Sequence, residues 1–129
     1  MAHSTLSRWL TENVADTRTP AGPPGRLYAA PFAEVWDSLL DQIHGRRGWK
    51  LIHADEELGL MTVMCTTPLF RFRDDLTIWV SLDENGLTRV EARSESRVGR
   101  GDFGVNRRRI DRMLALLDRS VGPAVRLGS

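Results

Sequence analysis

Several polar residues occupy positions that predicted strands and a predicted helix turn toward the hydrophobic core. Two of these strands, 72–82 and 88–96, are joined by a short turn, so their inward residues pair in a register that places a carboxylate opposite a serine. An asparagine lies on the apolar stripe of the helix that follows. Because buried polar groups require hydrogen-bond partners, we expect these side chains to meet at one end of the core. The residues expected there are Asp74, Ser94, Ser96 and Asn106, with Arg97 and Arg100 close by.

This group of polar residues has two interpretations. In the first, hydrogen bonds among them pin the helix to the sheet, and the group is a satisfied part of the core. In the second, they form the polar end of a pocket between the sheet and the C-terminal helix. Such a pocket would hold a small amphipathic or anionic ligand. The second interpretation makes the protein a non-enzymatic binding module, which is the primary functional expectation.

An apolar pair and nearby arginines suggest a second kind of site. Leu69 and Phe70 stand in a connection between strands, where polar residues are usual, and Arg71 and Arg73 follow them. Leu69 and Phe70 either fold back as a cap on the sheet end or form a docking patch. The patch would suit an apolar ligand, a protein partner or a membrane surface, and the arginines would suit an acidic partner.

A run of arginines, Arg107, Arg108 and Arg109, begins the last helix, where the helix dipole disfavours cations. These side chains are either solvated or paired with Asp74, Asp75 and Asp111, or they hold a phosphate or carboxylate group. The alternative functional expectation is therefore a protein- or membrane-surface interaction module. It would use the Leu69–Arg73 loop and the Arg107–Arg109 face.

The sequence contains no arrangement typical of catalysis or of metal binding. Its three histidines are not spaced as a metal-binding pair, and its single cysteine, Cys65, lies on an apolar strand face. Residues 99–104 match a G-x-G-x-x-G pattern, but no strand with an acidic residue follows the next helix, as a dinucleotide site requires. The glycines instead favour a sharp turn, with Asp102 as the N-cap of the helix. We expect no catalytic residue, metal or cofactor.

Composition is that of one globular domain. The chain has 129 residues, 41% of them hydrophobic, and a net charge of +1, which by itself indicates no class of partner. No nucleic-acid partner is expected. The charge is uneven: residues 1–96 contain 10 basic and 14 acidic side chains, and residues 97–129 contain 8 and 3. No segment has the length of a transmembrane span or the pattern of a signal peptide, and a lone cysteine excludes an intrachain disulfide. We expect a cytoplasmic protein.

Hydrophobic periodicity predicts an α+β fold with the order β-α-β-β-β-β-α. A curved antiparallel sheet would carry both helices on one face, because each helix has one apolar stripe. Along the strand 72–82, alternation assigns Phe72, Leu76, Ile78, Val80 and Leu82 to one face. The remaining expected elements are strands at 27–29, 49–55, 60–66 and 88–96, a helix from Pro31 to about Arg47, and a helix at about 103–120.

The chain divides into three expected parts. Residues 1–25 form an N-terminal arm, with a short helix at 5–14 and a Pro/Gly-rich linker, because three prolines and two glycines in 17–25 oppose regular structure. Residues 26–121 form the single α+β domain, and 122–129 form a C-terminal tail.

The stretch Ser94–Ile110, "SESRVGRGDFGVNRRRI", resembles the signature of the bacterial and plastid domain-of-unknown-function family 1499. The resemblance extends back through 71–80, 45–59 and 28–43. Some members carry a cysteine motif, "PNCVSS", near the N-terminus, where this chain has "ENVADTRTPAGPPG", so any role tied to that cysteine is absent. The family implies no activity. Separately, "YAAPFAEVWDSL" is similar to the opening of helix-grip domains, which often hold apolar ligands between sheet and helix.

Overall fold

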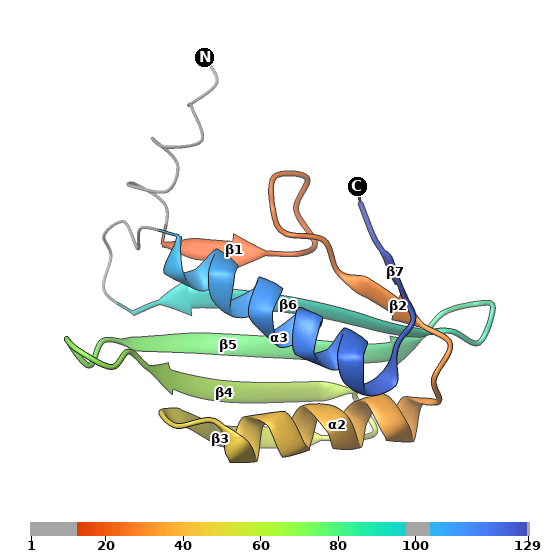
Figure 1. Cartoon of the computed structure of the whole chain (residues 1–129), viewed down its shortest axis with the longest axis horizontal. Coiled ribbons are helices and arrows are strands. Elements are labelled where there is room, and N and C mark those ends of the chain that lie inside the picture. Colours follow the sequence, from red (N-terminus) through yellow and green to blue (C-terminus); the bar gives the residue numbers. More distant parts are fainter. Residues whose placement is uncertain (1–12, 98–103, 129) are drawn as a thin grey trace.

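An antiparallel sheet carries both helices on one face in the computed structural model of the chain, which describes residues 13–97 and 104–128 (Figure 1). The strand order is β3-β4-β5-β6-β2-β7, and β1 also pairs with β6. This arrangement confirms the predicted α+β class. The elements are β1 (Val14–Asp16), β2 (Arg26–Tyr28), α2 (Phe32–Gly45), β3 (Trp49–Asp55), β4 (Leu60–Thr66), β5 (Arg73–Leu82), β6 (Thr88–Ser96), α3 (Val105–Val121) and β7 (Ala124–Arg126).

The hairpin of β5 and β6 has the register that the sequence predicts. Val80 pairs with Val90, and the same register carries Asp74 opposite Ser96 at the far end. The turn between the strands is closed by Asp83, whose Oδ1 accepts hydrogen bonds from the backbone amides of Asn85 and Leu87. Register matters here because a slip of one residue would turn the polar positions of the slipped strand to the opposite face, away from those of its partner.

The core lies between the sheet and the two helices. The apolar stripe of α2 buries Val35, Trp36, Leu39 and Ile43, and α3 buries Ile110, Met113, Leu114 and Leu117 against the same sheet face. The helices also meet each other, since Gln42 Nε2 donates a hydrogen bond to the Met113 carbonyl at 3.2 Å. Of the apolar residues assigned to one face of β5, Phe72 and Leu82 are exposed, because they stand at or beyond the strand ends, where no helix covers them.

Two short strands lie in the segments expected to be an arm and a tail. β1 pairs with the second half of β6, which its other neighbour, β2, leaves free. β7 pairs with the outer edge of β2. These strands of three residues are too short for alternation to reveal, and they form against existing strands, β1 against the long β6 and β7 against β2. The expected helix at 5–14 is contradicted at Val14, which begins β1. The rest of that prediction, residues 5–12, lies outside the described residues. The same holds for the glycine-rich turn, residues Gly99, Arg100, Gly101, Asp102 and Phe103.

Segment 17–25, expected as a linker, folds along the sheet. Its turns are closed by backbone hydrogen bonds, and the Arg18 guanidinium lies 3.8 Å from the ring centre of Trp79 on the sheet face opposite the helices. None of the helices in the described part of the chain has the length and apolar character needed to cross a membrane.

The turn between β3 and β4 requires glycine at position 59. Gly59 has φ +67°, and a Cβ there would stand 1.9 Å from the carbonyl oxygen of Val80. We expect Gly59→Ala to lower the free energy of unfolding by about 2 kcal/mol or more, because positive φ and a backbone clash add. Gly86→Ala is the control. Its φ is +79°, but nothing lies within 4 Å of the added Cβ, so we expect the free energy of unfolding to fall by only about 1 kcal/mol. Urea unfolding measures both variants, and an equal loss of unfolding free energy in the two would contradict this account.

Candidate functional site

Asn106 is the centre of a buried group of hydrogen bonds between α3 and the sheet. Its carbonyl Oδ1 accepts from Ser94 Oγ at 2.6 Å and from Arg109 Nη1 at 2.8 Å. Its amide Nδ2 donates to Ser96 Oγ at 2.9 Å and to the Asn13 carbonyl at 3.0 Å. Ser94 and Asn106 are fully buried. One side chain thus joins the first turn of α3 to β6 and to the residue before β1.

Arg109 and Asp74 supply the charges of this group. Arg109 Nη2 lies 2.8 Å from Asp74 Oδ2, and the two side chains are 9% and 2% exposed. Oδ2 accepts no well-aligned hydrogen bond from any described residue, so charge attraction rather than hydrogen-bond geometry holds this contact. Removing one partner would leave the other buried and uncompensated, which is costly. We name Asp74, Ser94, Ser96, Asn106 and Arg109 the Asn106 cluster.

The structure brings together four of the six residues that the sequence predicts at this site, and it adds Arg109. The added residue lies three positions after Asn106, which places it on the same side of the helix. The sequence analysis gave pairing with Asp74 as one interpretation of Arg107, Arg108 and Arg109, and the structure confirms it for Arg109. Ligand binding at the cluster stays a prediction.

Arg97 does not join the Asn106 cluster. Its guanidinium contacts both carboxylate oxygens of Asp75 on the opposite face of the sheet, where both side chains are exposed. The alternation of a strand explains this, because neighbouring residues point to opposite faces. Arg100 lies outside the described residues.

The three arginines expected to form one docking face point in different directions. Arg107 is half-buried and donates to the Ala21 carbonyl at 3.0 Å, Arg108 is exposed, and Arg109 is drawn into the core. The helix separates them because consecutive residues are about 100° apart around its axis. An Arg107–Arg109 surface is therefore not present as one face.

A second buried ion pair, missed from the sequence, ties the other half of α3 to β2. Arg26, only 3% exposed, donates through Nε to Asp118 at 3.1 Å, and Tyr28 Oη donates to the same carboxylate at 2.6 Å. Burial, together with this hydrogen bond to an anion, raises the pKa of Tyr28. The partners are about 90 residues apart in sequence, so no local pattern reveals them. Together they attach the C-terminal end of α3 to β2.

The loop between β4 and β5 carries the most exposed apolar side chains at this end of the sheet. Leu69 is 80% exposed and Phe70 is 72% exposed. The loop projects from the end of the molecule where α2 ends and α3 begins (Figure 1). It lies beside the α2–β3 turn, because the backbone amide of Thr66 donates to the Gly48 carbonyl at 2.8 Å.

Basic side chains gather on the two connections at this end. Segments 45–50 and 66–73 contain five cations and no carboxylate. None of the five forms an ion pair with a described residue. Burial and the neighbouring charge of Arg112 lower the pKa of Arg46, a sign that positive charge is concentrated here. We name this surface the basic–aromatic end: Arg46, Arg47, Lys50, Leu69, Phe70, Arg71, Phe72 and Arg73.

Comparison with known proteins gives one result. A family model described as Protein of unknown function (DUF1499) matches residues 11–117. The chain belongs to this family. The match contains the basic–aromatic end and the whole Asn106 cluster. No curated protein and no solved structure gives a significant match, so the similarity to helix-grip domains stays a prediction.

The buried hydrogen bonds of the Asn106 cluster lead to a prediction about the stability of this DUF1499 chain. Asn106→Leu keeps the side-chain volume but removes the partners of Ser94, Ser96 and Arg109 inside the core, so we expect a loss of about 3 kcal/mol in the free energy of unfolding. Ser120→Ala removes one exposed hydrogen bond on the same helix and is expected to cost less than about 0.5 kcal/mol. Urea unfolding of both variants gives the comparison, and a loss for Asn106→Leu as small as the control would contradict the account.

The burial of Cys65 leads to a second prediction for this DUF1499 chain, about the reactivity of its thiol. It is fully buried beneath the helices, opposite Asp74 across β4 and β5, and burial raises the pKa of its thiol to about 12. Thiolate is the reactive form. At neutral pH we expect a disulfide reagent to label the native protein on the order of a thousandfold more slowly than the urea-unfolded chain. Equal labelling rates would show that Cys65 is accessible.

Proposed function

We propose that this protein is a non-enzymatic binding module that docks through its basic–aromatic end. Its partner presents negative charge around an apolar surface. The observation that carries the proposal is the exposure of Leu69 and Phe70 at 80% and 72%, beside cations without ion-pair partners among the described residues. Apolar side chains exposed together and bordered by charge are typical of interaction sites.

The loop backbone holds Leu69 and Phe70 outward. The amide of Thr67 donates to the Phe72 carbonyl at 2.8 Å, and the Phe72 amide donates back to Thr67 Oγ1 at 2.9 Å. Phe70 stacks on Phe72 with ring centres 5.6 Å apart. Arg71 takes a φ of +56°, a left-handed conformation that is unfavourable for a side chain of this size. A strained, closed loop that exposes apolar groups is more consistent with binding than with the alternative role as a cap.

The Asn106 cluster supports the expected pocket less well. Ser94 and Asn106 are fully buried, and protein groups already satisfy them. One observation favours a small ligand there as a second candidate: Asp74 Oδ2 is buried and accepts no well-aligned hydrogen bond from the described residues, although Arg109 Nη2 lies 2.8 Å away. A ligand hydroxyl or amine could supply that donor. Native mass spectrometry of protein purified from its own host tests this, and a bare polypeptide mass would contradict it. For either candidate we propose a cytoplasmic location.

Docking can be tested inside the host cell by photo-crosslinking. A benzophenone side chain at position 70 is expected to form adducts, because Phe70 would lie in the interface. The matched control is position 58, since Leu58 is also 72% exposed but stands on the β3–β4 turn, at the opposite end of β4. We further expect Arg47→Glu to weaken the adduct from position 70 and Arg126→Glu, on β7, to leave it unchanged. Adducts that are absent, or equal from positions 70 and 58, would contradict the proposal.

A further inference from the structure

We infer that the partner of the basic–aromatic end is the surface of an anionic lipid bilayer, onto which the protein docks end-on. This inference rests on the proposed function, since it names the partner of that same surface. Three features of the structure support it: the order of side chains along the loop, the size of the apolar surface, and the distribution of charge between the two ends of the sheet.

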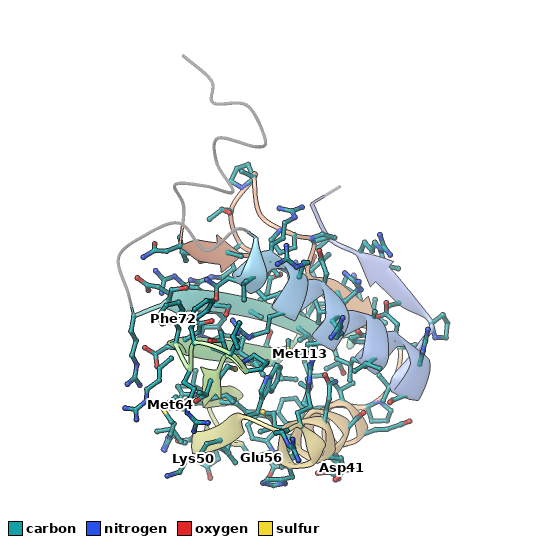
Figure 2. The ribbon with its side chains drawn as sticks, turned by 60° about the vertical axis from the view of Figure 1, so that its left-hand side comes forward. Asp41, Lys50, Glu56, Met64, Phe72 and Met113 are labelled. Carbon is teal, nitrogen blue, oxygen red and sulfur yellow. The ribbon has the colours of Figure 1, made fainter. Side chains whose placement is uncertain are left out.

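The side chains of the loop are ordered as a bilayer surface requires. Leu69 and Phe70 are the most exposed apolar side chains of the loop, while Phe72, at 44%, is partly covered and Arg73 begins β5. Apolar groups at the tip would enter the boundary of the acyl region, and cations behind them would lie at the depth of the lipid phosphates. Figure 2 shows Phe72, Met64 and Lys50 along one side of the molecule, and Lys50 pairs with Met64 in the sheet.

The apolar surface is small and protrudes. A stable protein–protein interface buries about 800 Å² on each partner and usually has an apolar centre inside a polar rim. Here the exposed apolar groups of the loop are Leu69, Phe70 and part of Phe72, and cations adjoin them. Insertion of a short apolar tip aided by electrostatic attraction is the usual mode of a peripheral membrane contact. An acidic protein is the alternative partner.

The turns at the two ends of the sheet carry opposite charge. The β3–β4 turn contains Glu56 and Glu57, and the β5–β6 turn contains Asp83 and Glu84, all at the ends of the strands away from the basic–aromatic end. An anionic membrane therefore attracts one end and repels the other, which orients the molecule with the Leu69–Phe70 tip toward the lipid. Near an anionic leaflet each cation strengthens binding by about fivefold, and salt reduces the effect.

Vesicle flotation with the full chain tests the inference. We expect the protein to float with vesicles that contain phosphatidylglycerol, to remain in solution with phosphatidylcholine alone, and to be released by high salt. The double variant Leu69→Ser/Phe70→Ser and the double variant Arg47→Glu/Lys50→Glu should each lose roughly tenfold or more in bound fraction. Leu58→Ser and Arg126→Glu are the matched apolar and charge controls and should bind as the unmodified protein does.

Several results would overturn the inference. They are the absence of flotation with anionic vesicles, equal binding to neutral vesicles, or equal losses in the variants and their controls. All substituted residues are exposed, and unchanged thermal unfolding would confirm that the variants are folded. If position 70 crosslinks to an acidic protein in cells while no vesicle is bound, the proposed docking surface stands and the membrane inference fails. If neither occurs, both fail.

Discussion

The pairing of Arg109 with Asp74 inside the core is the interaction on which the rest of this structure depends. It places a cation from the first turns of α3 on a carboxylate at the start of β5, with the two side chains 9% and 2% exposed. Asn106 extends the contact to β6 and to the residue before β1. At the other end of the helix, Arg26, Tyr28 and Asp118 make a second buried contact. Buried ion pairs contribute little net stability compared with apolar packing, but they strongly penalise any arrangement that separates the partners. They therefore fix the position of α3.

This internal pairing also determines the charge of the nearby surface. Asp74 is used within the core, and Asp75, its neighbour on the opposite face, is paired with Arg97. Both carboxylates that open β5 are thus neutralised, and segments 45–50 and 66–73 supply only cations beside them. The result is a basic–aromatic end that is attached to a rigid sheet end and opposes an acidic one. An interaction inside the core is in this way connected to the surface on which the proposed function rests.

The sequence predicted the long elements and the β5–β6 register, because hydrophobic alternation and a short turn determine both. It also predicted that Asp74, Ser94, Ser96 and Asn106 would meet, since that follows from register and helix phase. It did not predict β1 and β7, whose three residues form strands only against an existing edge. It placed Arg97 on the wrong face of the sheet. It named Asp74 among the partners of the arginine run 107–109, but a run of arginines gives no sign of which member turns inward. Arg26, Tyr28 and Asp118 are brought together by tertiary structure alone.

The pairing of Asp74 with Arg109 can be measured most directly by a double-mutant cycle. Asp74→Asn and Arg109→Met are made singly and together, and the free energy of unfolding of each is obtained in urea. The account predicts that each single variant loses about 3 kcal/mol and that the double variant recovers part of the loss, with a coupling energy above about 1.5 kcal/mol. Losses that simply add, within about 0.5 kcal/mol, would show that the two charges do not stabilise each other and would contradict the account.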